Sequence, residues 1–170
     1  MLREVTPTLW IGGETDCAAA LAMQSVGAGK WAGILHACKY PCHARILGYG
    51  GKVKLESGHP EYLAALRPGH LYLNVIDPPI PLFRVETFTR ALDFLDACAK
   101  DPLGRPALVH CNQAGSRAPS IALVWMAKRA ELLPDDSFAV AREVFLTRVP
   151  GYVPGAGLVA FLTERWKEIR

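Results

Sequence analysis

Segment 108–120 constrains the fold more than any other part of this chain. It begins with a short apolar run, passes through a His-Cys step into a polar loop with one glycine, and reaches Arg117 just before Pro119 opens a helical pattern. This order predicts a buried strand, a tight loop and a helix N-terminus. The thiol of Cys111 would stand at the start of the loop and a guanidinium at its end.

Such a loop has the chemistry of an anion site. Successive backbone N–H groups and the helix dipole favour negative charge, so they should lower the pKa of Cys111. The planar fork of Arg117 can hold two oxygens of a tetrahedral oxyanion. We therefore expect phosphate to be bound by Asn112, Gln113, Ala114, Gly115, Ser116 and Arg117.

The five residues between Cys111 and Arg117 resemble the HC-x5-R signature of the protein tyrosine phosphatases and their dual-specificity branch. None of the other four cysteines has an arginine six positions later. The resemblance implies that Cys111 is a nucleophile and that His110 supports the loop through hydrogen bonds. The sequence departs from the pattern at Ala114, where the family usually has glycine, and at Ala118, where it has serine or threonine.

Asp77 is the candidate general acid. It directly follows the predicted strand 71–75 and precedes three prolines, which restrict its loop. It stands 34 residues before Cys111, and the resemblance implies an acid about thirty residues before the nucleophile. The alternative is an ordinary turn carboxylate before proline.

Two further departures concern groups that support the nucleophile. The family's hydroxyl after the arginine speeds hydrolysis of the phosphoenzyme, and Ser116 or Ser120 could replace it here. Segment 148–158 is similar to the stretch of the dual-specificity branch that buttresses the cysteine loop, with Gly155 where asparagine is expected and Leu158 where phenylalanine is expected.

Hydrophobic periodicity predicts strands alternating with helices. The expected strands are 5–11, 33–37, 71–75 and 107–109, and the expected helices are 16–26, 61–66, 83–99, 119–130, a helix from Asp135 or Asp136 to Leu146, and a last helix ending at Trp166. This order predicts one α/β domain over residues 1–170, with a central twisted, mostly parallel sheet and helices on both faces. Ligands of such sheets bind at the carboxyl ends of strands, where Cys111 falls.

Composition limits the setting. With 170 residues, 51% of them hydrophobic, and a net charge of +3, the chain can bury a core, suits an anionic substrate, and gives no reason to expect nucleic-acid binding. Five cysteines, an odd number, indicate a reducing compartment. No apolar run approaches the roughly 18 residues of a membrane span, and the N-terminus lacks a signal-like stretch. The expected location is cytoplasmic, and the oligomeric state is left open.

Segment 36–43 contains two cysteines and two histidines. Its C-x3-C spacing fits no usual zinc pattern, so we expect neither a metal nor another cofactor. Cys38 ends a predicted strand and could form a reversible disulfide with Cys111 that protects the nucleophile. The alternative is a buried, unreactive thiol.

These observations predict a cysteine-dependent phosphatase that hydrolyses phosphomonoesters through a cysteinyl-phosphate. Its substrate would be a phosphorylated protein or a small phosphomonoester, with phosphotyrosine and also phosphoserine or phosphothreonine admitted by a shallow pocket. A phosphoinositide or RNA 5′-polyphosphate phosphatase is a weaker alternative, because the neutral Asn112, Gln113 and Ala114 stand where those enzymes usually have basic residues. A non-catalytic phosphate-binding module is the other alternative, motivated by Ala118 and Gly155.

Overall fold

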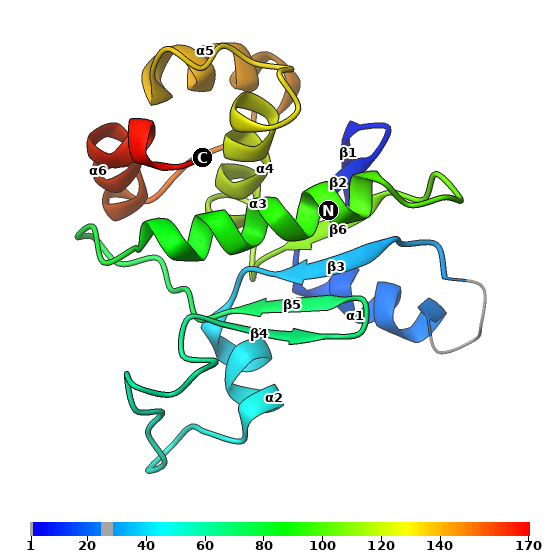
Figure 1. Ribbon diagram of the computed structural model, residues 1–170, viewed down its shortest axis with the longest axis vertical. Helices are drawn as coiled ribbons and strands as arrows, with labels where there is room; N and C mark the ends of the chain where they lie inside the picture. The colour runs from blue at the N-terminus through cyan, green and yellow to red at the C-terminus, as the bar shows by residue number, and fades with distance from the viewer. Residues whose placement is uncertain (1, 25–28) are drawn as a thin grey trace.

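The described residues, 2–24 and 29–170, form a six-stranded sheet in the computed structural model (Figure 1). The strands are β1 (Arg3–Thr6), β2 (Leu9–Gly12), β3 (Gly33–His36), β4 (Ala64–Arg67), β5 (His70–Leu73) and β6 (Ala107–His110). Their order is β1-β2-β6-β3-β5-β4. The four inner strands run parallel, whereas the edge strands β1 and β4 are antiparallel to their neighbours. The predicted mostly parallel sheet is confirmed.

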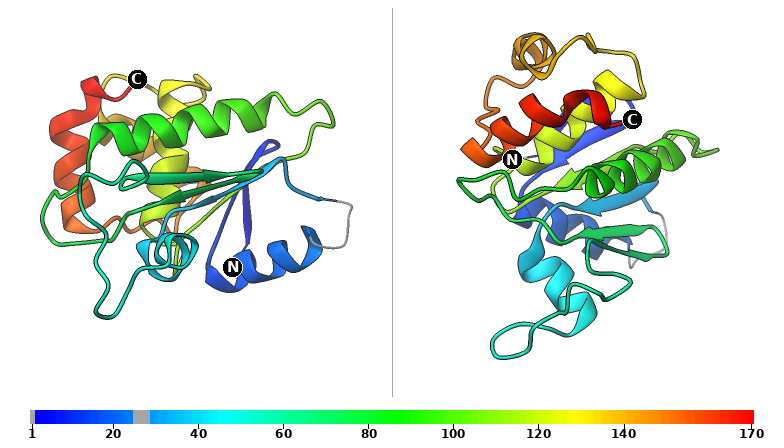
Figure 2. Two further views of the ribbon diagram at one scale, coloured as in Figure 1. Left: turned by 60° about the horizontal axis from the view of Figure 1, so that its bottom comes forward. Right: turned by 60° about the vertical axis from the view of Figure 1, so that its left-hand side comes forward.

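Helices cover both faces of this sheet (Figure 2). They are α1 (Glu14–Gln24), the turn η1 (Lys39–His43), α2 (Ala44–Leu47), α3 (Val85–Ala99), α4 (Arg117–Lys128), α5 (Phe138–Arg148), α6 (Ala156–Arg165) and the turn η2 (Trp166–Glu168). Helices α3 to α6 lie on one face, and α1 and α2 lie on the other. Among the described helices, none is long and apolar enough to cross a membrane.

Strand β6 is central and is buried from both sides. Ala107 and Val109 belong to the large core formed with α3 and α4, whereas Leu108 packs with Cys17 of α1 in a second, smaller core. Side chains alternate along a strand. Cys111 accordingly lies in the large core, and His110 faces the side of α1 and α2.

Two predicted elements were wrong. The predicted strand 5–11 is a hairpin, since β1 and β2 pair antiparallel around a turn at residues 7 and 8. The predicted helix 61–66 does not form, because Ala64–Arg67 is strand β4 paired with β5. Helix-forming alanine and leucine there are overruled by the tertiary pairing, which satisfies the backbone and buries Ala64 and Ala65.

Helix boundaries differ by smaller amounts. Helix α5 begins after Ser137, whose Oγ accepts a hydrogen bond from Val140 N–H, so the cap is Ser137 rather than the predicted Asp135 or Asp136. Helix α4 begins at Arg117 rather than at residue 119. The predicted end of the first helix, at residue 26, lies outside the described residues.

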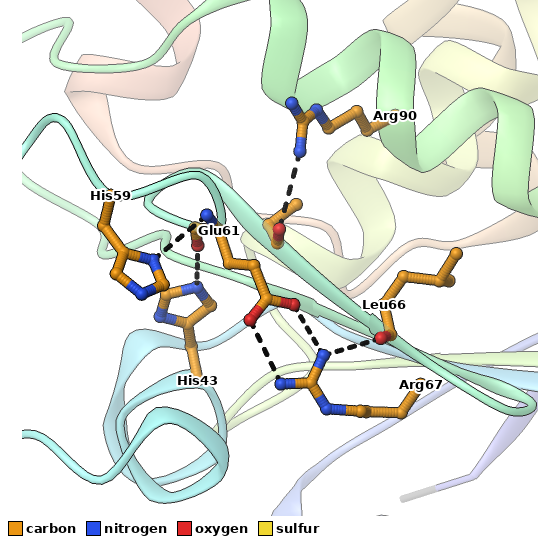
Figure 3. A network of polar contacts seen from close by, with 7 residues as sticks. His43, His59, Glu61, Leu66, Arg67 and Arg90 are labelled. Atoms are coloured by element: carbon orange, nitrogen blue, oxygen red, sulfur yellow. Dashed lines mark hydrogen bonds and ion pairs between the residues drawn. The ribbon is translucent and has the colours of Figure 1, made fainter.

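Polar contacts anchor the long connection between β3 and β4 to the edge of the sheet (Figure 3). The carboxylate of Glu61 pairs with the guanidinium of Arg67, and its backbone carbonyl lies 3.0 Å from Nε2 of His43. The backbone N–H of Glu61 donates to Nδ1 of His59. Glu61 therefore fixes the end of this polar connection just before β4.

Candidate active site

The cysteine loop leaves the carboxyl end of β6 and leads into α4. Cys111 is only 2% exposed, and its backbone N–H donates to Gly12 O at 3.3 Å. Ala114 adopts a left-handed conformation with φ +59°. This is the position where glycine was expected from the resemblance, and the backbone keeps the conformation that glycine favours.

Arg117, the first residue of α4, is held at the centre of three strand ends. Its Nη1 donates to Ala37 O, after β3, and to Val75 O, after β5, both at 3.3 Å. Its Nη2 donates to Asn112 Oδ1 at 2.7 Å. These contacts fix the plane of the guanidinium before any ligand binds, as bidentate recognition of an oxyanion requires.

The predicted nucleophile, arginine and acid meet in one cleft of about 620 Å³. Its lining comprises Asp77, Cys111, Asn112, Gln113, Gly115, Ser116, Arg117, Gly151, Val153, Pro154 and Gly155. Asp77 is solvent-exposed, whereas Cys111 is buried. Both side chains line the same cleft, one exposed and one buried.

The loop that carries Asp77 packs closely against two glycines, Gly155 and Gly157. A Cβ atom at Gly155 would collide with the carboxylate of Asp77, and one at Gly157 would collide with the carbonyls of Pro78 and Ile80. An asparagine at position 155 would therefore displace the carboxylate. The absence of the expected asparagine is explained by the close approach of Asp77.

Segment 149–155 also supports the cysteine loop from the other side. Val153 N–H donates to Gly115 O at 2.9 Å, and Gly155 N–H donates to Ser116 Oγ at 3.0 Å. Ser120 Oγ donates to Ser116 O at 2.8 Å and lies 2.8 Å from the hydroxyl of the buried Tyr152. The hydroxyls of Ser116 and Ser120 are thus both hydrogen-bonded where segment 149–155 packs against the cysteine loop.

Comparison with solved structures identifies the architecture. The chain matches DUSP15 with a TM-score of 0.64 over 97% of this chain and 86% of that chain, at 18% identity. It matches human DUSP28 with a TM-score of 0.64 over 98% and 93%, at 17% identity. The chain has the dual-specificity phosphatase fold. A third match is the human tyrosine phosphatase-like serine/threonine/tyrosine-interacting protein, with a TM-score of 0.64, 18% identity, and coverage of 98% and 96%.

No family model matches the chain, and no curated protein matches it. The likeness to dual-specificity phosphatases is therefore a likeness of fold, carried by the arrangement of elements along nearly the full chain.

A group of histidines and cysteines lies on the side of the sheet covered by α1 and α2, next to the end of β6 that leads into the cysteine loop. We call Cys17, His36, Cys38, Cys42, His70 and His110 the Cys-His cluster. His110 Nε2 lies 2.7 Å from Nδ1 of His36 and 3.9 Å from Sγ of Cys42. Nε2 of His36 lies 3.1 Å from Nδ1 of His70. His110, predicted to support the loop, therefore anchors the end of β6 in this cluster.

Burial sets the electrostatics of the Cys-His cluster. Loss of solvation, together with the neighbouring His110 and His70, lowers the pKa of His36 to about 2. Burial also lowers the pKa of His110. A hydrogen bond with Cys42 and burial raise the pKa of the Cys38 thiol. These shifts favour neutral imidazoles at His36 and His110 and a protonated thiol at Cys38.

Sequence reasoning found only part of the Cys-His cluster. It considered segment 36–43 alone and did not connect it with Cys17, His70 or His110, which are distant in the chain. The register of β3 against β6 pairs His36 with His110. The side chain of His36 in turn contacts Cys17 and His70. The structure places the thiol of Cys38 near Cys42 and His110, and a disulfide of Cys38 with Cys111 stays a prediction.

Proposed function

We propose that the protein is a cysteine-dependent phosphatase that hydrolyses phosphomonoesters through a cysteinyl-phosphate. The observation that carries this proposal is the shared cleft of Cys111, Arg117 and Asp77. The open rim suits phosphotyrosine and also the shorter phosphoserine and phosphothreonine. The neutral side chains of Asn112 and Gln113 favour these monoesters over polyphosphate substrates.

In the first step the thiolate of Cys111 attacks phosphorus. A sulfur–phosphorus bond forms as the bond from phosphorus to the leaving oxygen breaks, and Asp77 gives its proton to that oxygen. The loop N–H groups and the guanidinium of Arg117 stabilise the charge on the three remaining oxygens. The alcohol or phenol then leaves.

In the second step water attacks the phosphorus of the cysteinyl-phosphate. Asp77, now a carboxylate, takes a proton from this water, and the Cys111 sulfur leaves as a thiolate together with inorganic phosphate. Ala118 is fully buried and offers no hydroxyl, while the hydroxyls of Ser116 and Ser120 are already hydrogen-bonded. We expect the second step to be slow, since losing one such donor typically costs about 10²- to 10³-fold in rate.

Stopped-flow hydrolysis of an aryl phosphate without added metal tests this proposal. The wild type should show a rapid burst of one phenol per enzyme followed by slow turnover. Cys111→Ser should abolish both phases, and Asp77→Asn should slow turnover by about 10²- to 10⁴-fold. Asp136→Asn, which changes an exposed carboxyl in the turn before α5, serves as the matched control.

A non-catalytic phosphate-binding module is the second candidate, favoured by Ala118. It predicts that vanadate or phosphate binds to the wild type with neither burst nor turnover. Retention of turnover in Cys111→Ser would contradict both candidates, because the phosphatase would lack its nucleophile and the binding module predicts no turnover at all.

A further inference from the structure

The Cys-His cluster contains two overlapping sets of three metal-ligating side chains. Cys38, Cys42 and His110 form one set, and Cys17, His36 and His110 form the other. Within each set the ligand atoms all lie within 4.8 Å of one another. In a zinc site, bonds of about 2.3 Å to sulfur and 2.0 Å to nitrogen bring ligand atoms to mutual distances of roughly 3.3–3.8 Å. Small side-chain movements would close either set around one ion.

We propose that Cys38, Cys42 and His110 bind a zinc ion, with water in the fourth position. Two thiolates and one imidazole are ligands that zinc prefers, and soft sulfur ligands disfavour magnesium and calcium. This site is separate from the proposed catalytic cleft, and its existence does not depend on phosphatase activity.

Access distinguishes this set from its neighbour. Cys42 is half-buried in the turn η1, so an ion and its water can reach it from solvent. Cys17, His36 and His110 are all buried and include only one thiol, so that set has no comparable entry. His110 Nε2 is common to both sets, which means that they cannot be filled independently.

Binding has a defined chemical balance. Each thiol of Cys38 and Cys42 loses one proton, so two protons are released as two sulfur–zinc bonds form. The lone pair of His110 Nε2 makes the third bond, and the contact of this nitrogen with His36 Nδ1 at 2.7 Å is replaced. No oxidant or reductant is involved.

The ion would brace the cysteine loop from behind. His110 directly precedes Cys111, and the carbonyl of Tyr40, between the two cysteine ligands, accepts a hydrogen bond from Asn112 Nδ2 at 3.2 Å. The carbonyl of Ala37, just before Cys38, accepts from Arg117. Zinc would therefore tie together the two segments that hold the predicted phosphate-binding residues, and it should stabilise the folded state.

A cobalt titration of the full chain tests the site. The protein carries Cys111→Ser throughout, so that the catalytic thiol cannot bind the metal, and it is reduced and stripped of metal first. One equivalent of Co²⁺ should give thiolate-to-cobalt charge-transfer absorption and the strong visible bands of tetrahedral cobalt. Zinc should abolish both, and zinc should raise the melting temperature.

Substitutions then separate the two ligand sets. Cys42→Ser should weaken metal binding by more than about 100-fold, since even the loss of an outer partner of a ligand costs about 10- to 100-fold. Cys17→Ser should keep the affinity within a few fold. Cys42→His, which returns a ligand, should restore binding with a nitrogen-richer cobalt spectrum. This rescue separates loss of a ligand from misfolding of Cys42→Ser.

Three outcomes would overturn the proposal. Loss of binding in Cys17→Ser but not in Cys42→Ser would assign the metal to the fully buried set. No cobalt bands at stoichiometric metal would show that the cluster is not a metal site. Failure of reduced protein to bind, together with an oxidised form lighter by two hydrogens that peptide mapping assigns to Cys38 and Cys42, would make these cysteines a disulfide pair.

Discussion

His110 and Cys111 are consecutive in the chain, yet they belong to two polar regions that are built in different ways. The cysteine loop is one continuous segment, residues 111–117, on the side of α3 and α4. The Cys-His cluster, on the side of α1 and α2, takes its members from α1, β3, η1, β5 and β6. The geometry of the loop is set by its local backbone, whereas the cluster exists only once the strands are in register.

This difference predicts whether substitutions in each region should change activity or stability. Groups of the cysteine loop line a cleft, so we expect their loss to change activity with little change in stability. His36 and His110 are buried, and they contact each other rather than the cleft. Their loss should change stability first.

Arg117→Lys should have the largest effect and should fall on activity. A lysine ammonium cannot contact Ala37 O, Val75 O and Asn112 Oδ1 while holding two oxygens of phosphate. We expect kcat/KM to fall by about 10²- to 10³-fold. Steady-state hydrolysis of an aryl phosphate measures this fall.

The same Arg117→Lys protein also tests the separation of the two regions. Its free energy of unfolding in urea should stay within about 1 kcal/mol of the wild type, because its charge and one hydrogen bond can be kept. A large loss of stability with normal activity in the folded fraction would place Arg117 among the structural residues instead.

His36→Ala should have the next largest effect, and it should fall on stability. The imidazole is 1% exposed, stacks on Tyr72 with ring centroids 4.1 Å apart, and contacts His70 and His110. Its removal leaves a cavity and two histidines without this partner, so we expect about 2–4 kcal/mol of destabilisation. Urea unfolding measures this loss, and His59→Ala is the control. His59 is exposed and water can replace its contact with Glu61 N–H, so we expect this variant to stay within about 0.5 kcal/mol of the wild type. An equal loss in both variants would contradict the argument from burial.

Gly155→Asn should lower activity by about 10- to 100-fold. The new Cβ collides with the carboxylate of Asp77 and should push the proposed acid away from the leaving oxygen. The fall in kcat/KM, which reports the first step, should be largest for aryl phosphates with poor leaving groups, which need the proton most. Gly58→Asn, where a Cβ meets nothing within 4 Å, should behave as the wild type. An equal fall for good and poor leaving groups would show that the substitution at Gly155 does not act through Asp77.

The same contrast explains which features the sequence could reveal. Cys111, Arg117 and the helix start are coded within a few residues, so their order predicted the loop, and the alternation of strands and helices predicted the parallel sheet. The close packing of the Asp77 carboxylate against Gly155 could not be predicted from the sequence. A glycine has no side chain, so the sequence does not indicate which group occupies the space beside it. The Cys-His cluster could not be read either, since it depends on the pairing of His36 with His110 across the sheet.

Ala114→Gly should have the smallest effect, and its sign is the informative part. Alanine at φ +59° carries a steric cost of roughly 1–2 kcal/mol, which glycine avoids, and the greater freedom of glycine in the unfolded chain offsets part of this gain. We expect a net stabilisation of up to about 1 kcal/mol in thermal unfolding. The exposed helical Ala19→Gly should instead cost about 1 kcal/mol. Destabilisation by both substitutions would mean that Ala114 is not strained. Opposite signs would show that the cysteine loop imposes its backbone geometry on whatever residue stands there, as expected if backbone N–H groups are the donors of the proposed phosphate site.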